Sequence, residues 1–309
     1  MTTIESIEPT GSTVERPLER RRPPMRVWFR RTGWRHVVAL SALVFALFPV
    51  LWVLSAAVTA DGGLARQSFI PEDPSLDNFR ALMSDEGHPP FWRWFWNSMF
   101  IGTVTAVVTV FLCALGAFAF SRLRFKGRRP GMLALLLIQM FPNLLAVVAL
   151  FLFMTRIKGL FPAIGLGTSW GLIFIYLGGA LGVNTYLIKG FFDTIPHSLD
   201  EAAKIDGCTH SQTFFKIILP LAAPVLAVIA LLSFITTQAE YIVASVILSG
   251  DDDQKTLAVG LSNYVLAGFD NRWGPFAAGA LIGAVPVVIL FLFLQRYIVS
   301  GLTSGAVKE

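Results

Sequence analysis

Charged residues are scarce in this sequence. Asp, Glu, Lys and Arg make up 15% of its 309 residues, whereas a soluble domain carries roughly 25%. Hydrophobic residues account for 54%. These proportions exclude a water-soluble globular protein and indicate one polytopic membrane domain with short appendages, because a membrane crossing takes up about 20 residues without building a separate core.

Residue clusters that carry catalysis or bind metals are also missing. No lysine follows a glycine, so the Gly-Lys-Ser/Thr end of a Walker loop is absent, and any ATP must be hydrolysed by another chain. A membrane enzyme would need a nucleophile, a base or metal ligands clustered on one face of its helices, and the sequence predicts no such cluster. The histidines show no i, i+4 pair for zinc; they are His36, His88, His197 and His210. We expect no catalytic residue, metal or cofactor in this chain.

Cysteine is equally scarce. Cys113 lies in an apolar run and Cys208 in a polar loop, and the topology predicted below separates them, so no disulfide framework is expected.

The long uncharged stretches predict six transmembrane helices and therefore an all-α membrane protein. They lie at 37–58, 94–121, 130–155, 159–188, 217–239 and 273–295. The fourth stretch is too long for one straight span and opens with several glycines and a proline. We expect its first part to be a loop or half-helix, and the span proper to begin near Trp170.

Lys and Arg divide unevenly between the two sides that an even number of spans creates. One side holds 18 of them, in segments 1–35, 121–130, 189–219 and the end after 295. The other side holds 7, in segments 60–97, 155–170 and 249–275. The positive-inside rule therefore predicts that both termini are cytoplasmic and that the 249–275 loop is external. This asymmetry reports orientation in a lipid bilayer, and no nucleic-acid partner is expected.

The chain is accordingly divided into a basic tail at 1–35, a six-span domain at 36–300 and a cytoplasmic tail at 301–309. The first tail mixes Pro, Ser and Thr with eight arginines, a composition typical of disorder. Aromatic residues cluster where the second span enters from outside and are expected to anchor it in the interface: Phe91, Trp92, Trp94, Phe95 and Trp96.

The cytoplasmic loop at 196–220 contains two helix-start signatures in succession. Ser198 precedes Glu201 by three residues, and Thr209 precedes Gln212 by three, which is the spacing of a capping box. Gly207 between them can end the first helix in a left-handed conformation. We expect a compact helix pair that engages a soluble partner; an ordinary cytoplasmic connector is the alternative.

The same loop resembles the EAA motif of binding-protein-dependent ABC importer permeases. The resemblance rests on Glu201-Ala202-Ala203, Asp206-Gly207, Ile218-Leu219-Pro220 and Pro224, and Cys208 departs from the alanine common after the glycine. Further segments resemble the MalG-type permeases of maltose and maltodextrin importers: Gln139 to Pro142, Tyr176 to Gly179, Thr256 to Gly260, and Gly301 to Lys308. The likeness covers residues 36–309.

This resemblance implies the ABC type I importer permease architecture and a transport role in the bacterial plasma membrane. Such a chain pairs with a MalF-type permease and works with two ATPase subunits, which bind ATP and Mg, and with an extracytoplasmic sugar-binding protein. The ATPase-coupling interface would comprise Glu201, Ala202, Ala203, Asp206, Gly207, Phe214, Leu219 and Pro220. The external loop would meet the binding protein through Gly250, Asp251, Asp252, Asp253 and Gln254. Taken alone, the three aspartates indicate a solvated turn, because the glycine and glutamate of a calcium-binding loop are not found at the required positions after them.

Polar residues inside the predicted spans have two interpretations. Gln139, Asn143 and Asn184 could line a translocation path or act as glue between helices. Glu240 near the far end of the fifth span is either a functional intramembrane carboxylate or a hydrated group at the interface. An ion-coupled secondary transporter, the rival class, would need carboxylates at the membrane midplane, and Glu240 is the single candidate outside the loops.

Overall fold

The computed structural model describes residues 29–59, 69–71, 73–84, 90–266 and 272–304. Two compact units are present, residues 1–50 and residues 51–309. Among the described residues the regular elements are helices, accompanied by one isolated bridge between Thr59 and Pro74. This confirms the all-α prediction. Most of the basic tail, residues 267–271 of the loop predicted to be external, and residues 305–309 lie outside the described residues.

The first unit holds η1 (Phe29–Gly33) and the first two thirds of α2 (Trp34–Val58). Apolar side chains cover α2 on all sides, and Phe45 is 83% exposed. A helix that is hydrophobic all round suits a lipid environment.

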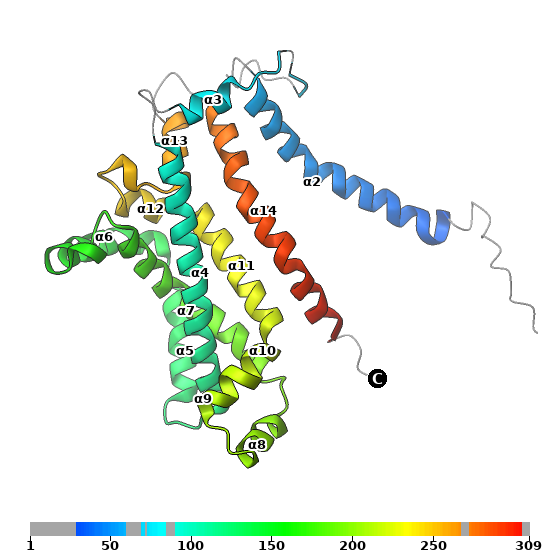
Figure 1. Ribbon diagram of the computed structural model, residues 1–309, viewed down its shortest axis with the longest axis vertical. Coiled ribbons are helices and arrows are strands. Elements are labelled where there is room, and N and C mark those ends of the chain that lie inside the picture. Colours follow the sequence, from blue (N-terminus) through cyan, green and yellow to red (C-terminus); the bar gives the residue numbers. More distant parts are fainter. Residues whose placement is uncertain (1–28, 60–68, 72, 85–89, 267–271, 305–309) are drawn as a thin grey trace, which may run out of the picture. The chain divides into compact units, whose positions relative to one another are not determined.

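The second unit is built around α4 (Phe91–Arg122), α7 (Ser169–Phe192) and α11 (Ala223–Ala239), which pack against one another (Figure 1). Its other long helix, α14 (Trp273–Ser304), packs against α11. The remaining elements are α3 (Asp77–Met83), α5 (Arg128–Gln139), α6 (Asn143–Leu160), η3 (Pro162–Ile164), α8 (His197–Ile205), α9 (His210–Thr213), η4 (Phe214–Ile218), α10 (Leu219–Leu221), α12 (Ile242–Ile247), η5 (Asp252–Gln254) and α13 (Leu257–Leu266).

Four described helices are long and apolar enough to cross a membrane: α2, α4, α7 and residues 273–297 of α14. The segment from α9 to α11 becomes a fifth if its bend of 77° is counted within one span. The predicted six spans are therefore not all found as single helices. The third stretch is divided, because α5 ends at Gln139 and α6 begins after Pro142, whose ring disfavours a continuous helix. The fourth behaves as predicted, with η3 preceding a span that begins at Ser169.

The aromatic cluster at the start of α4 is only partly the predicted interfacial belt. Phe91 and Trp94 are 2% and 0% exposed and pack in a core cluster with residues of α3, α13 and α14. Trp96 lies on the other face and is 64% exposed. Positions i and i+3 share one face of a helix, so the burial of that face withdraws both residues from the surface.

Candidate functional site

The first helix of the 196–220 loop, α8, has no side-chain cap at its N-terminal end and a glycine turn at its C-terminal end. The predicted box of Ser198 and Glu201 does not form, because the helix begins earlier, at His197 after Pro196, and no side chain caps it. Its C-terminal end follows the prediction. Gly207 has φ of +78°, and its N–H donates to Lys204 O at 3.0 Å while Cys208 N–H donates to Ala203 O at 2.8 Å. This pair of hydrogen bonds is a Schellman motif, which satisfies carbonyls that the helix end would leave free.

The second helix starts with the predicted capping box. Thr209 N–H donates to Gln212 Oε1 at 2.8 Å, and Gln212 N–H donates to Thr209 Oγ1 at 3.3 Å. The chain then continues through the π-helix η4, where Phe214 packs edge-on against Phe118 of α4 with ring centroids 5.1 Å apart. The loop is therefore anchored in the core of the helix bundle at its C-terminal side.

The residues predicted for the coupling interface fall into two groups. Ala203 and Phe214 are 3% and 2% exposed, so they hold the loop against the rest of the unit. The other members are exposed, except for Leu219, which is partly buried and packs against the core: Glu201, Ala202, Asp206, Gly207, Leu219 and Pro220. Sequence reasoning missed Ile205, which is 86% exposed at the last turn of α8. An apolar residue two positions before Gly207, among polar neighbours at the end of a short helix, was the sequence feature that could have indicated an exposed contact residue.

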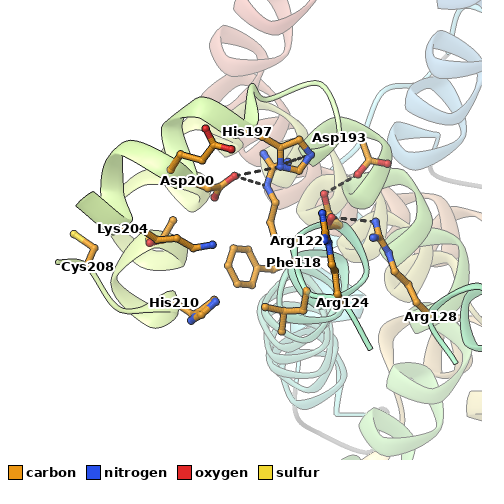
Figure 2. A pocket seen from close by; sticks show the side chains of 14 residues that line it. Phe118, Arg122, Arg124, Arg128, Asp193, His197, Asp200, Lys204, Cys208 and His210 are labelled. Carbon is orange, nitrogen blue, oxygen red and sulfur yellow. Dashed lines mark hydrogen bonds and ion pairs between the residues drawn. The ribbon is translucent and has the colours of Figure 1, made fainter. Parts of the chain in front are cut away.

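Arg122, the last residue of α4, braces the loop and was not predicted (Figure 2). Its Nε lies 3.0 Å from Asp200 Oδ2, and the two side chains are only 4% and 13% exposed. Its Nη2 donates to Ile195 O at 2.8 Å, and its Nη1 lies 3.2 Å from the His197 ring. One buried guanidinium thus connects the end of a spanning helix to the start of α8.

Asp193, which follows α7, makes a second tie close to the first. Its carboxylate accepts from Ser121 Oγ at 2.6 Å and from Lys189 Nζ at 2.5 Å. Partial burial raises the pKa of this carboxyl, but the hydrogen bonds from Lys189 and Ser121 outweigh that effect and hold the pKa below its usual value. The group is therefore charged at neutral pH and keeps α4 and α7 together.

A cavity of about 780 Å³ lies between α8, α9 and the end of α4. Lys204, His210 and Arg124 extend toward it and make no ion pair among the described contacts (Figure 2). The cavity lies beside the Arg122–Asp200 ion pair, and both of these residues belong to its lining.

Residues 113–304, including the entire loop and its anchors, match the family described as "Binding-protein-dependent transport system inner membrane component". The chain belongs to this family. The match covers more than half of the sequence and begins inside α4.

Relatives of this permease share about two fifths of its residues over most of its length. The MalG maltose/maltodextrin transport system permease of Vibrio parahaemolyticus is 40% identical, covering 92% of this chain and 96% of its own. The protein of that name from Escherichia coli K12 is 40% identical, covering 88% and 94%. A chain of a bacterial ABC transporter that imports the acidic polysaccharide alginate has a similar structure, with a TM-score of 0.70 and 26% identity, covering 87% of this chain and 97% of that one.

The three aspartates of the permease's 249–275 loop each have a separate partner. Asp251 Oδ1 accepts from Asp253 N–H at 3.0 Å, Asp252 Oδ1 lies 2.5 Å from Lys255 Nζ, and Asp253 pairs with Arg93 of α4. Over the described ranges, no group of three or more His, Cys, Asp or Glu is placed to hold a metal. The aspartates therefore shape the short η5 turn.

Gln139 of the permease joins two helices. Val183 N–H of α7 donates to Gln139 Oε1 at 2.6 Å, and Gln139 Nε2 donates to Gly179 O. Asn184 Nδ2 instead donates at 2.9 Å to Ala180 O of its own helix. Asn143 begins α6, but its side chain lies outside the described residues. A path-lining role for these three residues stays a prediction.

The Glu240 carboxylate accepts three hydrogen bonds. It accepts from Tyr176 Oη at 2.6 Å and from the N–H groups of Val243 and Ala244 at 2.8 and 2.9 Å. These two N–H groups lie in the first turn of α12, where the N–H groups find no carbonyl of the same helix to donate to. Glu240 therefore caps α12 and ties it to α7.

Proposed function

We propose that this permease carries an α-linked oligosaccharide of the maltose and maltodextrin class, or a trehalose-like disaccharide, into the cell. The observation that carries the proposal is the 40% identity, over 92% of this chain, to a permease named for maltose and maltodextrin. Identity of that level across nearly the whole length supports a related substrate class as well as a related fold.

The proposed assembly contains a paired MalF-type permease, two ATPase subunits and an extracytoplasmic sugar-binding protein. A bacterial alginate ABC transporter, solved in complex with an alginate pentasaccharide-bound periplasmic protein, shares the fold of this chain, with a TM-score of 0.62 and 17% identity. ATP and Mg would bind to the ATPase subunits. This chain would perform no bond chemistry itself.

The loop from α8 to α10 is the proposed coupling element, on the cytoplasmic side of the bacterial plasma membrane. Its exposed tip offers an apolar side chain at Ile205 and a sharp turn at Gly207. The Arg122 ion pair and the buried Phe214 keep this tip in place against the spans. A movement of the docked ATPases would then displace the spans as well, shifting them between inward-open and outward-open states.

The rival class, an ion-coupled carrier, finds little support around Glu240. A coupling carboxylate must exchange its ion or proton during the cycle. Here three donors occupy the carboxylate, and two of them are backbone groups of a helix end. This arrangement favours a structural role for Glu240.

Proteoliposomes that contain the complete complex with internal ATP provide the test. We expect sugar accumulation to require ATP and the loaded binding protein, and to survive collapse of all ion gradients. Comparing maltose, maltotriose and trehalose as stimulants of ATP hydrolysis identifies the sugar. Accumulation driven by an ion gradient without nucleotide would overturn the proposal.

A further inference from the structure

α4 is an uninterrupted helix of 32 residues, Phe91–Arg122, with no proline inside it. At about 1.5 Å per residue it extends roughly 48 Å, well beyond the ~30 Å of a hydrocarbon layer. α14 has the same length but contains Pro286, and the segment from α9 to α11 bends by 77°. Figure 1 shows α4 passing from α13 at one end to α9 at the other.

The Arg122 end of α4 is tied to the coupling loop by charge and by packing. The buried ion pair with Asp200 and the hydrogen bond to Ile195 O hold the start of α8. Phe118, one turn earlier, packs against Phe214 of η4. Both sides of the loop therefore contact the last two turns of α4.

The Phe91 end of α4 is tied to the segment 252–257 in the same manner. Trp94 Nε1 donates to Asp252 O at 2.6 Å. Asn97 Nδ2 donates to Asp253 O at 2.7 Å and to Lys255 O at 3.1 Å. Ser98 Oγ accepts from Leu257 N–H at 2.8 Å, and this last contact is buried.

These two sets of contacts make α4 a direct connection between the two loops. We propose that α4 transmits movement between the coupling loop and the segment 252–257, with Arg122 as the positioning residue at one end and Trp94 and Asn97 at the other. The inference rests on the proposed function, in which the ATPases contact the loop from α8 to α10, and on the expectation from the family resemblance that the binding protein meets residues 250–254. It adds the element and the side chains that link the two events.

The physical reason is that neither loop can move away from α4 without breaking a nearly buried ion pair or several hydrogen bonds. Displacing α8 from Arg122 leaves a nearly buried guanidinium without its carboxylate. Displacing the segment 252–257 exposes several carbonyls whose donors lie on α4. An unbroken helix between two such ties moves as one body, and closely packed neighbours convert its small displacement into a discrete rearrangement.

The first experiment measures ATP hydrolysis by the reconstituted complex with and without saturating sugar-loaded binding protein. Arg122→Gln should lower the stimulation at least about fivefold, the lower range of an allosteric coupling. Arg122→Lys, which keeps a charge for Asp200, should recover part of it. The matched control is Arg124→Gln, because Arg124 lines the same cavity without an ion pair to a described residue and should keep full stimulation.

The second experiment tests the other end of α4 in the same assay. The double variant Trp94→Phe/Asn97→Ala removes three hydrogen bonds to the segment 252–257 and keeps an aromatic ring in the core. It should lower stimulation to a similar degree. Trp96→Phe is the control, since Trp96 lies on the exposed face of the same helix.

The third experiment measures movement near the segment 252–257 when the ATPases close, in the absence of the binding protein. A fluorophore attached to Ser249→Cys, at an exposed position, should change its emission when a non-hydrolysable ATP analogue closes the ATPases. A Cys208→Ser background leaves only the buried Cys113. The change should disappear in Arg122→Gln and persist in Arg124→Gln.

The outcomes separate the two proposals. If the wild-type complex responds and Arg122→Gln keeps both the stimulation and the emission change, α4 is not the link. If the binding protein never stimulates the wild-type complex, the proposed function fails. The emission change then still tests whether α4 connects the two loops. Should Arg122→Gln fail to assemble with the ATPases, Asp200→Asn removes the same ion pair from the opposite side and must show the same loss.

Discussion

One backbone angle at Gly207 sets the turn between α8 and α9. Its φ of +78° lies in the left-handed region, and a Cβ there would meet no atom within 4 Å. A substitution would therefore act through backbone strain and not through a clash. The strain costs most residues about 1–2 kcal/mol, more for β-branched ones and less for asparagine.

Gly207→Val is expected to reduce sugar uptake sharply while the protein remains in the membrane at similar abundance. The reason is that a displaced α8 tip docks poorly on the ATPases. Gly207→Asn should retain most uptake, and Gly190→Ala, a glycine with open space and ordinary φ, should change nothing. Uptake assays together with co-purification of the ATPases measure this. Normal uptake in Gly207→Val would show that the turn is dispensable for docking.

Glu240→Gln should leave uptake dependent on ATP. The amide can still accept from Tyr176 or from α12 but carries no charge, so we expect a destabilisation on the order of 1–3 kcal/mol. Thermal unfolding of the purified complex measures the loss, with Tyr176→Phe as the control that removes one donor only. If sugar uptake by the Glu240→Gln variant no longer depended on ATP, the result would favour an ion-coupled carrier.

At the scale of elements, α5 and α7 approach closely enough for a side chain to enter the backbone ladder of the neighbouring helix. Gln139 accepts from Val183 N–H and donates to Gly179 O, the two groups that an α-helix would normally pair with each other. The approach requires glycine at 182, where a Cβ would lie 2.6 Å from Leu135 O. This glycine of α7 therefore serves close packing.

Gly182→Ala is expected to separate α5 from α7 and to destabilise the protein by about 1–3 kcal/mol, as overpacking typically does. Gly178→Ala is the matched control on the same helix, because a Cβ there meets no atom within 4 Å. Thermal unfolding in detergent compares the two variants. Equal stability would mean that the α5–α7 contact loosens at no cost.

At the scale of the whole molecule, the division of 18 against 7 basic residues predicts the sides of the membrane. With Cys208→Ser as background, a cysteine at Ser249 should react with a membrane-impermeant reagent in intact cells. A cysteine at Lys126 should react only after permeabilisation. Both positions are exposed, so access to the reagent depends on the side and not on burial. The reverse pattern would invert the predicted topology.

The sequence alone determined the features that depend on neighbours in the chain. The all-α fold, the spans α2, α4, α7 and α14, and the capping box at Thr209 follow from composition, apolar length and local hydrogen bonding. The left-handed turn at Gly207 follows from the absence of a Cβ. The resemblance to the permease family also lies in contiguous motifs, and for that reason the order of residues along the chain was enough to indicate it.

Tertiary structure decided which side chains from distant segments meet. Arg122 and Asp200 are 78 positions apart, and no local pattern marks them as partners. The burial of Trp94, and the role of Glu240 as a cap held by Tyr176, likewise depend on how α4, α7 and α12 pack. A hydrogen bond between such residues forms only when helix packing brings donor and acceptor within about 3 Å, a distance that sequence spacing does not encode.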